Sequence, residues 1–174
     1  MNPSYDRPTR QLHWASALLV LGLWALGQSI DFFPKGTPRV TARSLHISFG
    51  VLLAVLLALR VRWRLSGGTR LPPADAGLPG KLAAVMHGLL YLGLVAVVLV
   101  GLASVWIRGD TLFNLFTVPA FDAANKTLRH DVVELHGLVA NILLALAAAH
   151  AAMAIWHHRV LNDGVLRRMW PSLK

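Results

Sequence analysis

Residues 130–158 of this 174-residue chain read HDVVELHGLVANILLALAAAHAAMAIWHH and combine a long apolar run with several histidines. From Leu135 to His158 the run contains no Asp, Glu, Lys or Arg, which predicts a membrane-spanning helix. Histidines are expensive in hydrocarbon and need a reason to be there. His136 and His150 are fourteen residues apart. On a helix they therefore lie about 40° apart around the axis and about 21 Å apart along it. One helix face presents a ligand near each membrane surface, which suits two stacked cofactors.

The composition of the whole chain is that of an integral membrane protein. Hydrophobic residues make up 55% of the chain and charged residues 14%, and the mean hydropathy is +0.54. The chain has no cysteine, which excludes disulfides, thiolate-bound iron–sulfur clusters and covalently attached haem. The net charge of +9 does not indicate nucleic-acid binding, because the basic residues lie in short segments between apolar runs. Any metal ligands must come from histidine.

Four segments are apolar enough and nearly all long enough to cross a bilayer, so the sequence predicts an all-α, four-helix up-down bundle. The expected helices lie at about 11–30, 44–61, 82–107 and 132–158, in a single domain that covers residues 1–174. The tail, 159–174, mixes arginines with apolar residues and is expected to form a helix on the membrane surface and not a fifth membrane span. A cleaved signal peptide is the alternative interpretation of the first segment, but its apolar run exceeds the usual length of about 7–15 residues.

The distribution of basic residues predicts the orientation. The N-terminal segment, the second loop and the tail together carry eleven of the seventeen Lys and Arg residues. Because cytoplasmic segments are enriched in Lys and Arg, we expect both termini and the second loop to be cytoplasmic. The chain is thus predicted to be a multi-pass protein whose natural partner is the lipid bilayer.

Depth in the membrane predicts how the histidines pair. In this topology His13 and His150 lie toward the cytoplasmic side, whereas His46 and His136 lie toward the external side. The crossed combinations would have to reach across most of the bilayer. We therefore expect two bis-histidine sites, one formed by His13 with His150 and the other by His46 with His136.

A flat macrocycle next to a helix needs a small side chain one turn from its ligand. Each of the four paired histidines is followed four residues later by alanine or glycine, namely Ala17, Gly50, Ala140 and Ala154. The other histidines are followed at the same spacing by larger residues, namely Tyr91, Glu134, Leu161 and Asn162. The pattern supports the chosen set of four ligands.

The remaining histidines keep several interpretations open. His157 is an alternative to His150 as the inner ligand, although it and His158 read as interfacial, solvated residues. His87 is a candidate second-shell donor, haem-propionate partner or quinone contact. His130 reads as a loop residue. The structural alternative for an intramembrane histidine is a hydrogen bond to a neighbouring helix.

The chemistry of the four histidines favours haem over zinc or a proton relay. Zinc sites usually gather three or four ligands at one depth, often with a carboxylate or thiolate. A proton relay would be expected to use intramembrane Asp or Glu, and neither occurs in the uncharged runs at 11–30, 44–59, 82–107 and 135–158. Two six-coordinate b-type haems fit better. Because such haems have no open iron position, they favour electron transfer over oxygen binding.

These residues resemble the bacterial cytochrome b561 family over nearly the whole chain. The likeness is carried by five features, which are His13-Trp14, His46 with Gly50, Arg108-Gly109, His136, and the run from His150 to the His157-His158 pair. The resemblance implies a four-helix protein of the bacterial inner membrane that binds two haem b groups and exchanges electrons with ubiquinone. It implies that His13, His46, His136 and His150 are the axial ligands of the haem irons. At least one branch of the family resembles a superoxide oxidase.

Three functional hypotheses follow. The first is an oxidoreductase that passes electrons from an external donor, such as superoxide, to the ubiquinone pool. The second is a non-catalytic cytochrome b subunit that serves a periplasmic redox protein. The third is a bundle without haem in which the histidines are structural. The sequence does not decide whether the chain is itself an enzyme, although the first hypothesis is favoured.

Candidate residues for the haem propionates and for a quinone follow from charge and position. Arg10 on the cytoplasmic side and Arg43 on the external side are the candidate propionate partners, with other basic residues near them. His87 and Arg108 are the candidates for a catalytic or quinone-binding role.

Overall fold

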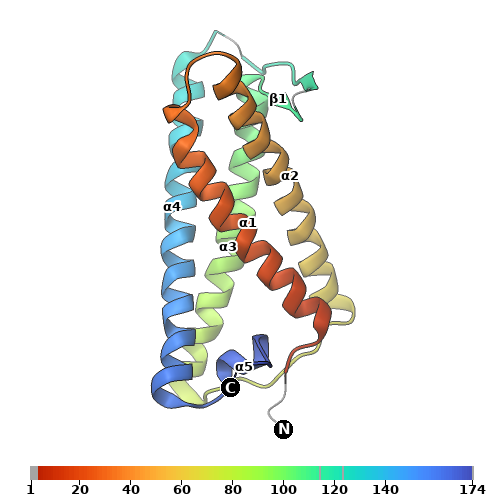
Figure 1. Cartoon of the computed structure of the whole chain (residues 1–174), viewed down its shortest axis with the longest axis vertical. Helices are drawn as coiled ribbons and strands as arrows, with labels where there is room; N and C mark the ends of the chain where they lie inside the picture. The colour runs from red at the N-terminus through yellow and green to blue at the C-terminus, as the bar shows by residue number, and fades with distance from the viewer. Residues whose placement is uncertain (1–3, 114, 123, 174) are drawn as a thin grey trace.

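The described residues form four long helices, and all four are long and apolar enough to cross a membrane. The structure is a computed structural model that describes residues 4–113, 115–122 and 124–173. The helices are α1 (Arg7–Ser29), α2 (Thr37–Ser66), α3 (Gly77–Arg108) and α4 (Lys126–Trp156). Figure 1 shows them running up and down in sequence order, with both ends of the chain at the same end of the bundle. The predicted four-helix membrane bundle is confirmed.

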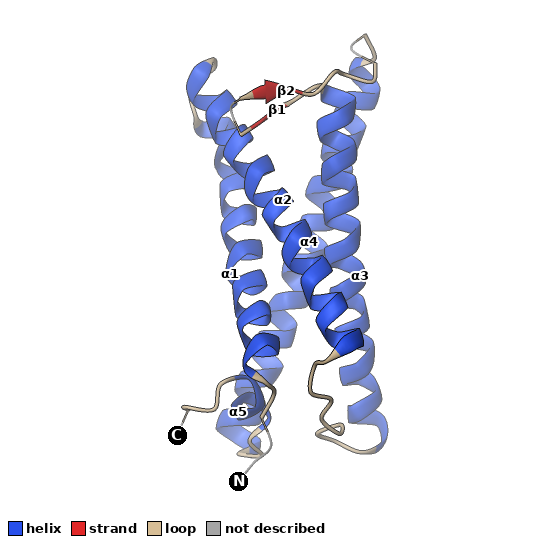
Figure 2. Cartoon of the chain, turned by 90° about the vertical axis from the view of Figure 1, so that its right-hand side faces the viewer, coloured by secondary structure: helices blue, strands red, loops and turns tan. Residues whose placement is uncertain are grey.

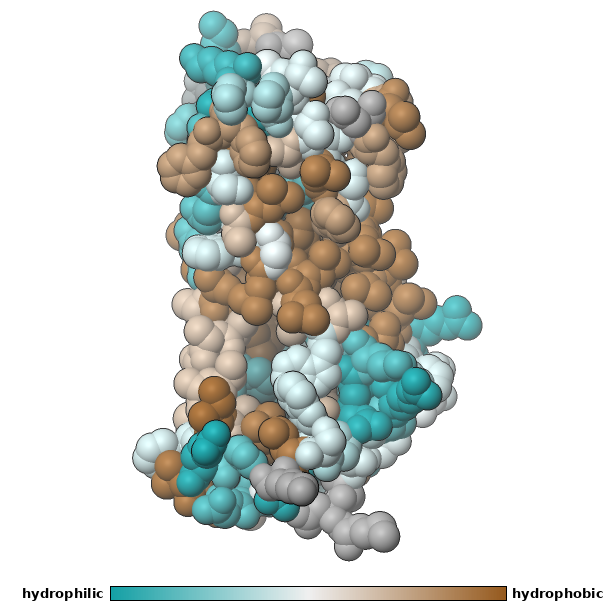
Figure 3. All heavy atoms as spheres, viewed as in Figure 1, coloured by the Kyte–Doolittle hydropathy of each residue, from teal (hydrophilic) through white to brown (hydrophobic). Residues whose placement is uncertain are grey.

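We call the end that carries both termini the terminal end and the opposite one the hairpin end. The hairpin end is named after β1 (Thr111–Leu112) and β2 (Phe116–Thr117), two short antiparallel strands between α3 and α4 (Figure 2). The sequence predicts only a long polar connection from Arg108 to about Asp131, so this hairpin was not predicted. Figure 3 shows apolar residues over the middle of one face and hydrophilic residues toward both ends, as a bilayer requires.

The helices are longer than the uncharged runs that predicted them. α2, for example, extends the expected 44–61 to Thr37–Ser66, and α4 begins six residues before the expected position 132. Charged residues are compatible with a helix outside the hydrocarbon, so charge marks the membrane boundary and not the helix boundary. The actual ends have local causes. Asp6 caps α1 by accepting from Thr9 N, Asn125 caps α4 by accepting from Leu128 N, and Gly109 ends α3 at φ +71°.

The helices pack mainly as two pairs, α1 with α2 and α3 with α4. A small apolar core joins the pairs, and its buried residues are Leu23, Leu53, Leu57, Leu94, Val97 and Leu143. Every helix contributes to this core. The rest of the apolar surface faces outward, where lipid replaces a protein partner.

The tail forms less helix than expected and packs against the start of the chain. After α4 the helix widens into a π-helical turn (His157–Leu161), and α5 spans only Val165–Met169. Trp14 Nε1 donates to the Met169 carbonyl at 3.2 Å, and the Trp14 ring meets that of Trp170 edge-on at 5.3 Å. The tail therefore docks on the terminal end of α1. Residues 1–3 and 174, at the two ends of the predicted domain, lie outside the described residues. Residue 174 is also the last residue of the predicted tail.

Candidate haem sites

The pair of histidines nearer the hairpin end is His46 on α2 and His136 on α4. Their ring centroids lie 6.1 Å apart, and the ring planes are nearly perpendicular, at 87°. Nδ1 of each ring is buried and forms no hydrogen bond. Two imidazoles at this separation leave room for a single metal ion between their ring nitrogens.

A cavity of about 270 Å³ surrounds these two rings and lies between all four helices. Several of its lining residues lack a large side chain, and these are Gly27, Gly50, Gly101, Gly137 and Ala140. The absence of side chains there is what keeps the space open. Two of them, Gly50 and Ala140, are the small residues that the sequence placed one turn after His46 and His136.

The cavity reaches the hairpin end at a cluster of charged residues. Arg108 Nε lies 3.1 Å from Asp110 Oδ2, and Arg43 lies 3.7 Å from Asp110 Oδ1. Burial raises the pKa of the Asp110 carboxyl, while Arg108, Arg43 and Arg129 act in the opposite direction. Three arginines around one carboxylate give this mouth a local positive charge. Arg43 and Arg108, predicted for different roles, thus belong to one site.

The second pair lies nearer the terminal end and includes a third histidine. The His13 ring on α1 lies 6.4 Å from the His150 ring on α4, and the His87 ring on α3 lies 5.2 Å from it. His13 and His150 are partly buried, whereas His87 is exposed. The structure therefore brings together the expected pair and places the candidate His87 directly beside it.

Arg60 is a site residue that the sequence analysis missed. Its guanidinium stacks over the Tyr91 ring at 5.3 Å, and its charge acts on both His13 and His87. A signal for it was present, since Arg60 follows His46 by fourteen residues, the spacing that separates His136 from His150. The same face of α2 thus reaches both levels.

The fourteen-residue spacing occurs on every membrane helix. His13 and Gly27 show it on α1, and His87 and Gly101 show it on α3. We call His46 and His136, nearer the hairpin end, the outer pair, and His13 and His150, nearer the terminal end, the inner pair. Each helix therefore presents one residue at the level of the outer pair and one at the level of the inner pair. The outer level combines two glycines with two histidines, and the inner level combines three histidines with Arg60.

Two buried arginine atoms at the terminal end are without a hydrogen-bond partner. They are Nε of Arg10, a predicted propionate partner, and Nε of Arg167 on α5. A buried guanidinium nitrogen without a partner is costly and suits an anionic group. Arg167 was not predicted, because the sequence does not reveal that the tail packs back on the bundle.

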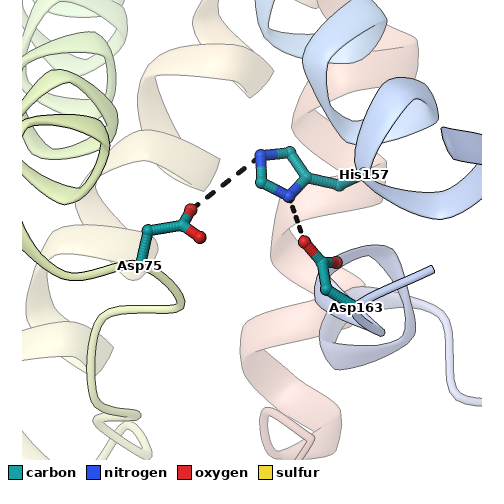
Figure 4. A group of neighbouring side chains, drawn as sticks. All are labelled: Asp75, His157 and Asp163. Carbon is teal, nitrogen blue, oxygen red and sulfur yellow. Dashed lines mark hydrogen bonds and ion pairs between the residues drawn. The ribbon is translucent and has the colours of Figure 1, made fainter. Parts of the chain in front are cut away.

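His157 lies in a different environment from the four paired histidines (Figure 4). Its Nδ1 contacts the Asp163 carboxylate, and its Nε2 lies 3.9 Å from Asp75 Oδ2. His157 thus links the tail to the segment before α3, and both imidazole nitrogens face carboxylates. This arrangement favours His150 over His157 as an inner ligand. His130, expected in a loop, lies in α4, where it is exposed and pairs with Asp131.

Comparison with known proteins agrees with the resemblance to the bacterial cytochrome b561 family. The family model for prokaryotic cytochrome b561 matches residues 4–172. The chain belongs to the prokaryotic cytochrome b561 family. It is therefore a membrane-bound b-type cytochrome, a bacterial electron-transport protein of the oxidoreductase class.

Relatives in this family cover almost the full chain. Cytochrome b561 homolog 1 of Escherichia coli is 33% identical over 94% of this chain and 94% of its own length. The probable superoxide oxidase CybB of Yersinia pestis is 31% identical over 99% of this chain and 98% of its own length. Cytochrome b562 of Cereibacter sphaeroides is 31% identical over 96% of this chain and 95% of its own length.

The residues of this cytochrome b561 chain fit the b-type haem that the family binds. Two metal–nitrogen bonds of about 2 Å, together with the distance from each nitrogen to its ring centre, separate two imidazole centroids by roughly 6 Å. The 6.1 Å and 6.4 Å separations match that value, whereas the 5.2 Å between His87 and His150 is shorter. The glycine-lined cavity beside His46 and His136 would accommodate such a group.

Proposed function

We propose that this chain binds two haem b groups and carries electrons from superoxide outside the inner membrane to ubiquinone within it. His46 and His136 would hold the outer haem, and His13 and His150 the inner one. The observation that carries the proposal is the stacking of two facing histidine pairs at two depths of one bundle. When bound, the haems supply one-electron carriers, and the chain supplies their ligands, spacing and surroundings.

The charges at the outer mouth support an anionic donor. Arg43, Arg108 and Arg129 lie around Asp110, so an anion that approaches the hairpin end meets net positive charge. Two superoxide ions would each give up one electron and leave as dioxygen. Two electrons and two protons would convert one ubiquinone to ubiquinol, which balances the reaction.

The exposure of His87 supports a quinone contact at the inner level. The His87 ring lies beside that of His150, and His87 is an exposed residue. A lipid-soluble substrate reaches such a position from within the membrane, and the imidazole offers it a hydrogen bond. Arg108 lies at the opposite end of α3, so we assign it to the outer mouth and not to the quinone site.

Rapid mixing tests the donor. The purified cytochrome is mixed with superoxide, and haem reduction is followed by absorbance at several salt concentrations. We expect reduction that slows as salt rises and slows further in Arg108→Gln. Arg39→Gln is the matched control, because Arg39 pairs with Asp31 away from the cavity. An unreduced haem after mixing would contradict superoxide as the donor.

A second function is favoured by one feature of the hairpin end. The hairpin exposes 51% of Phe113, 83% of Leu115 and 55% of Phe116, which suits docking of a periplasmic redox protein. In that case the chain would be a non-catalytic electron-transfer subunit. A failure of superoxide to reduce the haems, combined with rapid reduction by a co-purifying periplasmic protein, would favour this function.

A further inference from the structure

Gly27 and Gly101 lie against the two outer histidines across helix contacts. A Cβ at Gly27 of α1 would lie 3.2 Å from Cε1 of His46, and one at Gly101 of α3 would lie 3.0 Å from Cε1 of His136. Both distances are shorter than carbon atoms normally pack, so each ring would have to move by a few tenths of an ångström. Glycine at both positions lets an imidazole rest directly on a neighbouring helix backbone.

The contact fixes which ring nitrogen faces the backbone. Nδ1 of His46 is 3.5 Å from the Gly27 Cβ position, and Nδ1 of His136 is 3.4 Å from that of Gly101. In each case the carbonyl four residues earlier, that of Leu23 or Val97, lies close enough to act electrostatically on the imidazole, although no hydrogen bond forms between them. The Nδ1 side of each ring therefore faces a helix backbone, and Nε2 is left for the cavity.

The two contacts are equivalent by position. α1 and α3 present a glycine at the outer level, and α2 and α4 present the histidine that rests on it. Each glycine follows by four residues the carbonyl that its histidine faces. Two independent helix pairs thus use the same device. The inner level differs, because α1 and α3 present His13 and His87 there.

We propose that Gly27 and Gly101 are positioning residues of the outer haem site, which hold Nδ1 of His46 and His136 against the carbonyls of Leu23 and Val97. This inference rests on the proposed function, since it assumes that the two histidines bind haem. A ligand imidazole whose N–H faces a carbonyl is more basic and a better donor to iron. More basic ligands favour the ferric state, so the two glycines keep the reduction potential of the outer haem low.

The test is a redox titration of the two haems, followed by absorbance, in Gly27→Ala and Gly101→Ala. A methyl group at either position pushes the imidazole away from its carbonyl. We expect one of the two haems to titrate at a higher potential, or to be lost, while the other keeps its wild-type potential. A general loss of packing would not move a single potential in this way.

Two glycines provide matched controls. Gly22 on α1 has nothing within 4 Å of its Cβ position, so Gly22→Ala tests the effect of alanine in that helix alone. Gly93 on α3 is as crowded as Gly101, but its neighbour is the Leu143 side chain, at 3.1 Å. Gly93→Ala therefore tests crowding without a histidine, and we expect both haem potentials to stay at their wild-type values in both controls.

The outcomes separate this inference from the proposed function. Unchanged potentials in Gly27→Ala and Gly101→Ala would overturn the role of the glycines while two haems remained bound. An equal shift in Gly93→Ala, or a loss of both haems from the test variants, would overturn it as well. A wild-type protein that bound fewer than two haems would instead contradict the proposed function.

Discussion

At the scale of single residues, the inner site is distinguished by an arginine that faces histidines within the membrane. Arg60 is held over Tyr91 and acts electrostatically on His13 and His87. A fixed positive charge beside a haem stabilises the reduced form, and Arg60 is therefore expected to raise the potential of the inner haem.

Replacing Arg60 tests this effect. In Arg60→Gln we expect the potential of one haem to fall by an amount on the order of tens of millivolts, because one nearby charge is removed. The measurement is a redox titration of the purified protein. Arg62→Gln is the control, since Arg62 lies two residues further along α2, where it lines a groove with Gln11 and Ala15 of α1. A fall of equal size in both variants would rule out a specific role for Arg60.

At the scale of elements, Asp6 ties the start of α1 to the end of α2. Its carboxylate accepts from Thr9 N at 2.9 Å, from Trp63 Nε1 at 3.0 Å and from Thr69 N at 2.7 Å. Burial alone would raise the pKa of Asp6, but these hydrogen bonds outweigh it and lower the pKa well below the ordinary value of 3.8. The charged carboxylate is therefore the form that stabilises this end of the bundle.

The pH dependence of stability tests the Asp6 contacts. A carboxyl with a lowered pKa in the folded state stabilises the protein above its unfolded pKa, and this stability is lost as the pH falls below that value. Asp6→Asn should cost about 1 kcal/mol near neutral pH, as other helix caps do. We expect the gap in unfolding temperature between wild type and variant to narrow below pH 3.8. A gap that stayed constant into acid would contradict the assignment.

The tail is the second element whose position depends on a few contacts. His157 faces Asp163 and Asp75, so it links the end of α4, the tail and the segment before α3. The pKa of Asp163 is lowered, because its hydrogen bond from His157 outweighs the effect of burial. His157→Ala should therefore release the tail and leave both haems in place. Faster proteolysis after residue 161, with two haems per chain, is the expected result. Loss of a haem would instead make His157 a ligand.

At the scale of the whole molecule, the sequence predicted the bundle because lipid imposes long uncharged runs. The same rule explains why helix ends were missed, since α2 and α4 continue past the charged residues that mark the membrane surface. The pairs His46–His136 and His13–His150 were predictable from depth alone, because up-down helices match histidines by level.

What could not be predicted depends on how the helices face one another. The contact of Gly27 with His46, the place of Arg60 beside His13 and the return of Arg167 to the bundle all require helix rotation and tail packing. A hydropathy pattern determines neither the rotation of the helices nor the packing of the tail. The repeated fourteen-residue spacing was visible on all four helices, and it would have indicated Gly27, Arg60 and Gly101 before the structure.

The most direct test of the account is the haem content per chain of detergent-purified protein, measured for wild type, His46→Ala and His150→Ala. We expect two haems with six-coordinate, low-spin spectra in the wild type. Each variant should lose one haem, or convert it to a high-spin form, and keep the other, because the two pairs lie at different levels. A wild-type protein without haem under haem-replete expression, or a variant that kept both haems unchanged, would contradict the two-site arrangement.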